Sequence, residues 1–404
     1  MNLALIADTF SPLRSSGAVQ LRDLSREFIE QGHDITILVA SSQLPAPFIL
    51  EDFGGVHVLS LRTPKMKDVS YIRRTLAEFL MPFFMRHHYR SSPLQNSKWD
   101  AVVWYSPSIF LGPFVSYIKK TSQCRSYLII RDIFPEWAVD MGLMGKGLPY
   151  LFFKAIANHQ YSLADVIGVQ TPGNKAYFNK WLAKCTGRLE VLQNWLADTK
   201  DTGCSIRLQD SKLSGRKIFV YAGNMGIAQG IGVLFRLAVA LRERSDIGFV
   251  FVGRGSSAQQ LRDDVTAQKL ENVLLFDEID PDEIPGLYSQ CDIGLVSLDQ
   301  RHRSHNIPGK FLSYMQAGLP VLAAVNDGND IVDIIQSESV GYVSTDGNSD
   351  SLRAEAEKLI LDLQQGVDFR CRCKHLAAKL FSPSTAVEQI VSALDCVESG
   401  NERL

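Results

Sequence analysis

The sequence lacks the features that mark several large classes of protein. Its most apolar stretch, Phe79–Met85, is far shorter than the roughly 18 to 20 residues that a membrane-spanning helix requires. The 404 residues are 46% hydrophobic and 21% charged, a composition that excludes disorder, a collagen helix and a coiled coil. We therefore expect an ordinary globular chain of about two to three domains.

The seven cysteines do not make a disulfide framework, because their number is odd and they are scattered along a long chain. Cys371 and Cys373 have only His375 near them, so ordinary thiols are favoured over a zinc site. The segment Met1–Ala7 has no basic residues before its apolar run and predicts a core strand rather than a secretory signal. We expect a cytoplasmic protein and assign no metal.

The net charge of −2 hides an asymmetry. Residues 1–200 hold 22 Lys and Arg against 16 Asp and Glu, whereas residues 201–404 hold 20 against 28. The basic excess gathers in residues 62–90, where apolar and aromatic residues lie between the charges. Such a segment is typical of an interfacial helix, and we expect it to dock on the anionic surface of the inner membrane. The alternative is packing into the core, with Pro82 interrupting a single long helix.

Short runs of apolar and β-branched residues alternate with helical patterns along the whole chain, and continuous runs of this kind indicate strands covered on both faces. The expected strands are 3–7, 35–39, 101–104, 127–130, 166–169, 218–222, 249–252, 273–276, 293–296, 321–324 and 341–343. This order predicts an α/β protein with two Rossmann-like, doubly wound parallel sheets. We expect an N-terminal domain at 1–195, a polar linker at 196–217, a second domain at 218–383, and a C-terminal helix at 384–404 that packs back on the first domain.

Two glycine-bearing loops follow expected strands and precede expected helices. Gly17 lies in the first, before a helical pattern over 19–31, and Tyr221–Gly230 contains the second. Glycine lets a backbone approach a phosphate, and a helix start favours negative charge. The alternative for both loops is a tight turn that binds nothing.

Five stretches in the second half resemble, in the same order, motifs of the bacterial GT-B glycosyltransferases of family 4. They are a glycine loop, a Gly-x-Gly turn, the entry to a strand, a nucleotide-sugar helix and the turn after it, at Tyr221–Gly230, Phe251–Gly255, Tyr288–Asp292, Ile307–Phe311 and Ala317–Val321. In the first half, Arg131–Glu136 resembles a branch of O-antigen and capsule assembly that includes L-fucosamine transferases. The resemblance spans nearly the whole chain.

The resemblance implies the GT-B fold, with two domains facing across a cleft. It also implies metal-independent, retaining transfer of a sugar, such as L-FucNAc, from a UDP-sugar to a lipid-linked saccharide, with no cofactor beyond this donor substrate. The donor-binding candidates are Gly17, Asn224, Gly226, Gln229, Gly230, Arg254, Arg301, Arg303, Gly309, Lys310, Phe311 and Ser313.

The residues also favour a diphosphate site at Ile307–Phe311 on physical grounds. Pro308 suits the first helical position, and the N–H groups that follow it attract negative charge. Lys310 adds a full positive charge and is the catalytic candidate for stabilising the leaving diphosphate. The alternative is a turn with a solvated lysine, and in either case we expect the side chain to be exposed.

The chain departs from the family pattern at the ribose and phosphate contacts. Two glutamates with seven residues between them are typical of the family, whereas His305 and Ser313 stand here. Ser313 cannot clamp two hydroxyls as a carboxylate does. Asn224 and Gln229 stand where Arg and Lys are frequent, which places more of the leaving-group charge on Lys310.

On the acceptor side, Asp132 and Glu136 follow the strand that ends at Ile130, so we expect them at the carboxyl edge of the first sheet. Either could accept a proton from an acceptor hydroxyl, and both are catalytic candidates. For Glu136, a carboxylate that merely stabilises a helix start is an equal alternative.

Two other functions remain open at this point. A sugar-nucleotide epimerase on the same fold needs several carboxylates and histidines in the cleft. A catalytically degenerate subunit of a polysaccharide assembly complex is suggested by the missing glutamates. NAD binding is poorly supported, because the turn at Gly253–Gly255 lacks the third glycine of the dinucleotide fingerprint.

Overall fold

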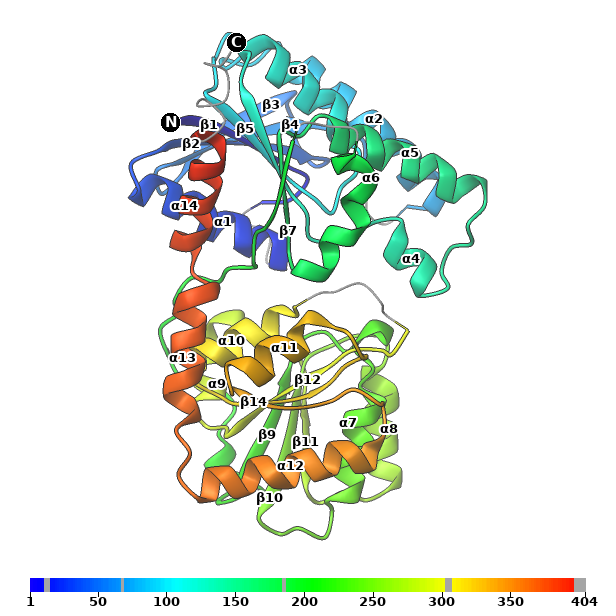
Figure 1. The fold of residues 1–404 in the computed structure, drawn as a ribbon, viewed down its shortest axis with the longest axis vertical. Coiled ribbons are helices and arrows are strands. Elements are labelled where there is room, and N and C mark those ends of the chain that lie inside the picture. The colour runs from blue at the N-terminus through cyan, green and yellow to red at the C-terminus, as the bar shows by residue number, and fades with distance from the viewer. Residues whose placement is uncertain (11–14, 67–68, 184–186, 302–306, 396–404) are drawn as a thin grey trace. The chain divides into compact units, whose positions relative to one another are not determined.

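The computed structural model describes residues 1–10, 15–66, 69–183, 187–301 and 307–395. The chain forms two compact units, one made of Met1–Trp195 together with the residues from Pro383 onward, and the other of Leu196–Ser382 (Figure 1). Arg303, His305 and residues 396–404 of the predicted C-terminal helix lie outside the described residues.

Unit 1 is built on an eight-stranded sheet in the order β3-β4-β2-β1-β5-β6-β7-β8. Seven strands run parallel, and only β3 is antiparallel to its neighbour β4. The five strands predicted for this half are confirmed, and β3, β4 and β8 are additional. The strands are β1 (Asn2–Ala7), β2 (Asp34–Ser41), β3 (Phe48–Phe53), β4 (Val56–Arg62), β5 (Ala101–Tyr105), β6 (Arg125–Ile129), β7 (Val166–Val169) and β8 (Arg188–Val191).

Helices cover both faces of this sheet. One face packs against α1 (Ser16–Glu30) and α14 (Pro383–Asp395), and the other packs against α2 (Tyr71–Tyr89), α3 (Gly112–Ser122), α5 (Leu148–Ser162) and α6 (Asn179–Leu182). The short helix α4 (Glu136–Asp140) follows β6. The prediction that Pro82 interrupts the helical segment is wrong, since α2 continues through Pro82, which is buried.

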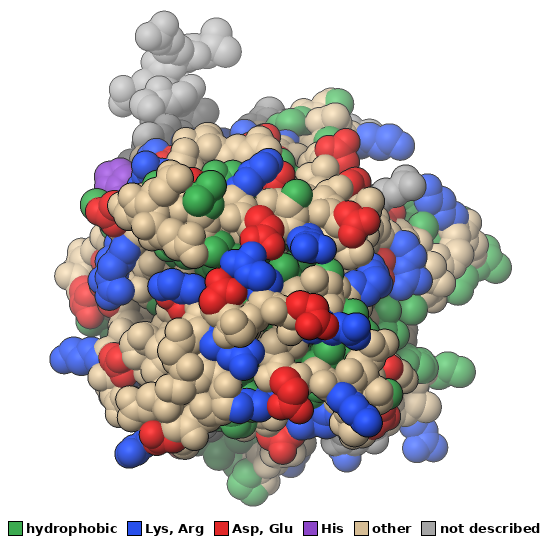
Figure 2. Space-filling view, turned by 90° about the horizontal axis from the view of Figure 1, so that it is seen from below, with side chains coloured by type: hydrophobic (Ala, Val, Ile, Leu, Met, Phe, Trp, Pro, Cys, Tyr) green, Lys and Arg blue, Asp and Glu red, His purple; other side chains and the backbone are tan. Residues whose placement is uncertain are grey.

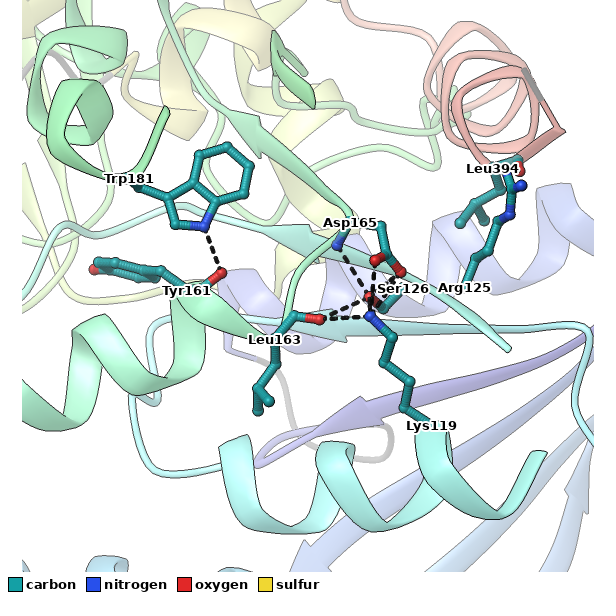
Figure 3. Close-up of polar contacts among 8 residues, drawn as sticks. All are labelled: Lys119, Arg125, Ser126, Tyr161, Leu163, Asp165, Trp181 and Leu394. Atoms are coloured by element: carbon teal, nitrogen blue, oxygen red, sulfur yellow. Dashed lines mark hydrogen bonds and ion pairs between the residues drawn. The ribbon is translucent and has the colours of Figure 1, made fainter. Parts of the chain in front are cut away.

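Helix α14 belongs to unit 1 although it follows unit 2 in the chain. Val387, Ile390 and Leu394 are buried in the same core as α1, and the Arg125 guanidinium donates a hydrogen bond to the Leu394 carbonyl at 3.0 Å (Figure 3). The same view shows that Lys119 connects the start of β6 with the start of β7 through polar contacts. Its ammonium group pairs with Asp165 at 2.8 Å and donates to the Leu163 carbonyl at 2.9 Å.

Unit 2 is built on a parallel six-stranded sheet in the order β11-β10-β9-β12-β13-β14, and the six strands predicted for this half are confirmed. The chain winds outward from β9 in one direction and then from β12 in the other. In such sheets, ligands bind at the carboxyl ends of the strands where the winding reverses. The strands are β9 (Lys217–Ala222), β10 (Ile247–Val252), β11 (Val273–Phe276), β12 (Ile293–Ser297), β13 (Val321–Ala324) and β14 (Gly341–Ser344).

The helices of unit 2 also lie on both faces of their sheet. One face packs against α7 (Gly232–Ala240), α8 (Ala258–Ala267) and α12 (Ser349–Gln364), and the other against α9 (Ile284–Tyr288), α10 (Gly309–Ala317), α11 (Asp330–Ser337) and α13 (Phe369–Leu380). Tyr314 fixes α10 to the sheet, because its buried hydroxyl donates to the carbonyls of Val220 and Leu295 at 3.0 and 3.2 Å. Gly294 makes room for the Tyr314 ring, since a Cβ there would lie 2.4 Å from it.

The segment predicted as a linker, 196–217, is part of unit 2. Ile206, Leu208 and Leu213 are buried in its core, and the Leu196 N–H donates to the Phe381 carbonyl at 3.0 Å. The segment is mostly polar and its apolar residues have no regular spacing, so these three buried side chains did not stand out in the sequence.

Candidate functional site

The loop after β9 lies at the point where the winding of the second sheet reverses. The Tyr221 hydroxyl, at the end of β9, donates to the Asn224 carbonyl at 2.7 Å. The Gln229 side-chain oxygen accepts from the Gly226 N–H at 3.1 Å and from the Asn224 amide at 3.4 Å. Asn224, Gly226 and Gln229 therefore hold the loop in one closed turn. Gly230 ends it with a φ of +58°, a conformation that favours glycine.

Two glycines of the next loop allow close packing against this turn. A Cβ on Gly253, where φ is +142°, would lie 2.0 Å from the Gly223 carbonyl oxygen, and one on Gly255, where φ is +150°, would lie 2.5 Å from Met225. The Met225 N–H donates to the Arg254 carbonyl at 2.8 Å. The Gly-x-Gly turn thus supports the glycine loop and need not itself contact a ligand.

Lys310 places a positive charge beside the glycine loop. Its ammonium nitrogen donates to the Tyr221 hydroxyl at 2.9 Å and lies 4.1 Å from the centre of the Tyr221 ring. A Cβ on Gly223 would lie 3.6 Å from the Lys310 side chain. Burial lowers the pKa of Lys310 from 10.5 to about 8. The prediction of an exposed lysine is wrong, because the side chain is half-buried against Tyr221.

The start of α10 differs by one residue from the prediction. Pro308 is the N-cap and has an extended backbone, and Gly309 is the first helical residue. The side chain of Ser313 donates back to the Gly309 carbonyl at 3.3 Å. Phe311 is fully buried and packs edge-on against Phe381 at 5.9 Å, so its side chain belongs to the core rather than to a ligand-binding surface.

The two other basic candidates within the described part of unit 2, Arg301 and Arg254, are held by acidic neighbours. Arg301 makes two contacts of 2.8 Å with Asp299, whose backbone adjoins Gly230. Arg254 is exposed and pairs with Glu278 at 2.7 Å. Eight of the donor-binding candidates thus follow strand ends or begin a helix at one edge of the sheet: Asn224, Gly226, Gln229, Gly230, Arg254, Arg301, Gly309 and Lys310. Gly17 belongs to unit 1.

Two residues of this edge were missed from the sequence. Tyr221 holds both Lys310 and the glycine loop, and its only signal was a phenol group in an otherwise apolar strand. Asn326 follows β13 and has a buried side-chain oxygen without a hydrogen-bond partner among the described residues. A buried acceptor of this kind needs a donor, and a ligand hydroxyl could supply it.

In unit 1, the carboxyl ends of β1, β5 and β6 bring Gly17, Tyr105 and Asp132 to one edge of the sheet. A Cβ on Gly17 would lie 3.3 Å from the Tyr105 ring. The Tyr105 hydroxyl donates to the Gln20 side chain at 2.8 Å, and its pKa is raised to about 12, mainly by burial and in part by the charge of Asp132. Asp132 is half-buried.

Arg131, next to Asp132, is buried at the same edge. Its guanidinium donates to the carbonyls of Leu192 and Gln193 at 2.9 and 3.2 Å and lies 4.7 Å from the centre of the Trp195 ring. Burial lowers the pKa of Arg131, and the charge of Asp132 acts in the opposite direction. Asp132 therefore lies beside a fixed cation.

Glu136 begins α4 and forms an ion pair with Lys154 on α5. One Glu136 oxygen is buried with no hydrogen-bond partner among the described residues. The negative charge of Glu136 and burial both raise the pKa of Tyr150, with burial as the larger cause. This geometry gives Glu136 structural partners in Lys154 and Tyr150.

Within the described ranges, no group of three or more His, Cys, Asp and Glu side chains could hold a metal ion. The same part of the chain contains no helix that is long and apolar enough to cross a membrane.

Comparison with known proteins connects these features to a family. Residues 216–362 match the family described as "Glycosyl transferases group 1". The chain has the GT-B fold. Its structure is similar to that of sucrose-phosphate synthase from Thermosynechococcus elongatus, with a TM-score of 0.74 and 13% sequence identity. The superposition covers 99% of this chain and 100% of that one. The chain is also similar to HepE of Anabaena, solved with UDP and glucose, with a TM-score of 0.67, 14% identity, and coverage of 98% of this chain and 100% of that one.

Two curated relatives are glycosyltransferases by name. WbjE of Pseudomonas aeruginosa is 24% identical over 53% of this chain and 54% of its own length. WcaI of Escherichia coli strain K12, named for colanic acid biosynthesis, is 24% identical over 71% of this chain and 74% of its own. The first match thus spans about half of WbjE. Together with the family match to unit 2, these relatives support a glycosyltransferase.

Proposed function

We propose that the protein transfers a sugar from a UDP-sugar to an acceptor hydroxyl. The single observation that carries this proposal is the position of Lys310, whose ammonium group lies beside the glycine loop of a group 1 glycosyltransferase domain. The solved HepE structure with UDP and glucose, which shares the fold, is consistent with this donor class.

In the proposed reaction, the donor diphosphate lies between the backbone of the loop at Gly223–Gly230 and the start of α10. A helix start and the Lys310 ammonium group both stabilise negative charge. As the bond between the sugar and the diphosphate breaks, the electron pair leaves with the diphosphate, and Lys310 stabilises the charge that develops there. The buried oxygen of Asn326 is a candidate acceptor for a donor hydroxyl, a contact that the absent glutamate pair would otherwise make.

On unit 1, Asp132 is the proposed base. Its carboxylate accepts the proton of the acceptor hydroxyl as that oxygen attacks the anomeric carbon. The neighbouring Arg131 guanidinium, held by backbone carbonyls, places a positive charge beside this carboxylate. Transfer with retention of the anomeric configuration is part of the proposal and follows from the family resemblance.

The proposed acceptor is a lipid-linked saccharide of O-antigen or capsule assembly, and the proposed sugar is an N-acetylated deoxysugar such as L-FucNAc. The colanic acid role in the name of WcaI and the likeness of Arg131–Glu136 to the L-fucosamine branch support this choice. An acceptor of this kind places the enzyme at the cytoplasmic side of the inner membrane.

The test begins with UDP and a panel of nucleotide sugars, because a ligand that binds the folded state raises the unfolding midpoint. The best-binding sugar nucleotide is then incubated with lipid-linked acceptors, and the products are identified by mass spectrometry. We expect a glycosylated lipid and free UDP. Consumption of the sugar nucleotide without an acceptor would instead indicate an epimerase, and no UDP binding would indicate a catalytically degenerate subunit.

A further inference from the structure

Helix α2 of unit 1 carries two apolar stripes on opposite sides. Ala77, Met81 and Met85, spaced by four residues, face the core. Ile72, Leu76, Phe79 and Phe83, spaced by four, three and four residues, are all exposed and share the other side of the helix. The outer stripe extends about 16 Å along the helix. A helix that packs only into its own domain needs the first stripe and not the second.

A second helix extends the outer stripe. Phe152 of α5 lies 6.3 Å, centre to centre, from Phe79 of α2. Leu148 and Leu151, on the first two turns of α5, are also exposed, Leu148 by 82%. We call the outer side chains of these two helices, Ile72, Leu76, Phe79, Phe83, Leu148, Leu151 and Phe152, the α2–α5 face.

The charges around this face have mainly one sign. Arg73, Arg86 and Arg90 are exposed on or directly after α2. The one acidic residue of the helix, Glu78, is already paired with Arg74 at 2.8 Å. In the view of Figure 2, basic and acidic side chains alternate without a large area of either sign. Exposed apolar and aromatic groups flanked by arginines match the interface of an anionic bilayer, which offers acyl chains and phosphate groups together.

We infer that the α2–α5 face is a docking surface for an anionic lipid bilayer, into which its apolar side chains insert while the arginines contact lipid phosphates. A protein partner would need acidic groups to match the arginines as well as an apolar surface, and a second copy of this chain would bring arginine against arginine. This inference deepens the proposed function, on which it rests for the reason to approach a membrane, by naming the surface that brings the enzyme to a lipid-linked acceptor.

The test is co-sedimentation of the full chain with phosphatidylcholine vesicles that contain or lack phosphatidylglycerol. We expect binding that requires the anionic lipid and weakens at high salt. The double variant Ile72→Ser with Phe83→Ser should bind at least about tenfold more weakly, because it removes inserted apolar area. Its matched control is Leu361→Ser on α12 of unit 2, which is also exposed, by 52%, and should bind normally.

A second pair of variants tests the charges. Arg73→Gln with Arg90→Gln should weaken binding to the anionic vesicles, whereas Arg353→Gln with Lys374→Gln, which removes two exposed charges from unit 2, should not. Binding that ignores lipid charge, or that survives the Ile72 and Phe83 substitutions, would overturn the inference. So would a dimer in sedimentation velocity that these substitutions dissociate, because the face would then be a self-association surface.

Loss of the proposed function is distinguishable from loss of docking. UDP binding is measured on the same variants without vesicles, and unit 2 carries the residues assigned to it. A chain that binds vesicles as expected but not UDP contradicts only the proposed function, and a chain that binds UDP but not vesicles contradicts only the docking surface.

Discussion

The ammonium group of Lys310 lies 4.1 Å from the centre of the Tyr221 ring and donates a hydrogen bond to its hydroxyl, which in turn donates to the Asn224 carbonyl. The positive charge and the glycine loop are therefore connected through one phenol group. A diphosphate that binds the loop meets a lysine that is already oriented, so little side-chain entropy is lost on binding.

We expect Lys310→Ala to weaken UDP binding by about 10- to 100-fold, since a hydrogen bond to a charged group contributes about 1.5–3 kcal/mol. Isothermal titration calorimetry measures this. The fold should be retained, because burial of the ammonium group opposes folding. Lys374→Ala, which removes an exposed lysine of α13, is the control and should bind UDP normally. Equal affinity in the two variants would eliminate Lys310 from the donor site.

The lowered pKa of Lys310 predicts a pH dependence of UDP affinity. Above a pKa of about 8 the lysine loses its charge, so the affinity should fall by up to about tenfold per pH unit. Lys310→Arg keeps its charge, so this variant should lose the pH dependence that comes from the lysine. The dependence that comes from the titration of UDP itself should remain. Parallel pH curves for the two proteins would contradict the prediction.

The same shift affects stability with a defined sign. Between about pH 8 and 10.5 the unfolded chain holds the Lys310 proton and the folded chain does not, so the stability contributed by this residue rises with pH through that window. Urea unfolding of wild type and Lys310→Met at about pH 7.5, below the window, and about pH 10, near its upper end, measures the difference. The increase in the free energy of unfolding caused by Lys310→Met should be larger at the lower pH.

Asp132→Asn should lower turnover by about tenfold or more with little change in UDP affinity, because an amide cannot accept the proton and the donor residues belong to the other unit. Steady-state rates with saturating donor measure the effect. Asp140→Asn, on the neighbouring helix α4, is the control. If Asp132→Asn lowers the free energy of unfolding as well as turnover, Asp132 is instead a structural carboxylate.

Glu136→Gln decides between the two roles left open for that residue. Its ion pair with Lys154 predicts a loss of about 1–3 kcal/mol in the free energy of unfolding, measured in urea. A double-mutant cycle with Lys154→Met should recover a coupling between the two. Normal stability with abolished turnover would favour the catalytic role.

Gly253→Ala should destabilise unit 2 more than Gly366→Ala does. Both glycines have positive φ, but a Cβ on Gly366 meets nothing within 4 Å, whereas one on Gly253 would lie 2.0 Å from the Gly223 carbonyl. Gly366→Ala should cost about 1–2 kcal/mol from backbone conformation alone. Urea unfolding compares the two, and UDP affinity should fall only for Gly253→Ala, because only this change displaces the glycine loop.

The sequence predicted the strands that have a continuous apolar run and missed those that do not. Ile218–Ala222 is continuously apolar because helices cover both sides of β9. In contrast, β3 at Phe48–Phe53 is a partly exposed edge strand with two acidic residues, and β8 at Arg188–Val191 carries an ion pair, so neither has a continuous apolar run.

The candidate site was predictable where it depended on local sequence. The glycines of the β9 loop and Lys310 could be identified from motifs that follow strands or begin helices. The role of Tyr221 could not, because it depends on the approach of α10, which begins far along the chain from β9 and is fixed by the buried Tyr314. The same packing explains why Lys310 is half-buried, although its motif predicts an exposed side chain.

Helix α14 has a consequence for how the chain folds during synthesis. Unit 1 includes both the first strand and the last described helix, and Val387, Ile390 and Leu394 complete the core against α1. Unit 2 is continuous from Leu196 to Ser382, so all of its residues leave the ribosome before α14 does. Because domains generally fold as units, the later unit in the chain can mature first, and the earlier one must wait with an uncovered apolar surface.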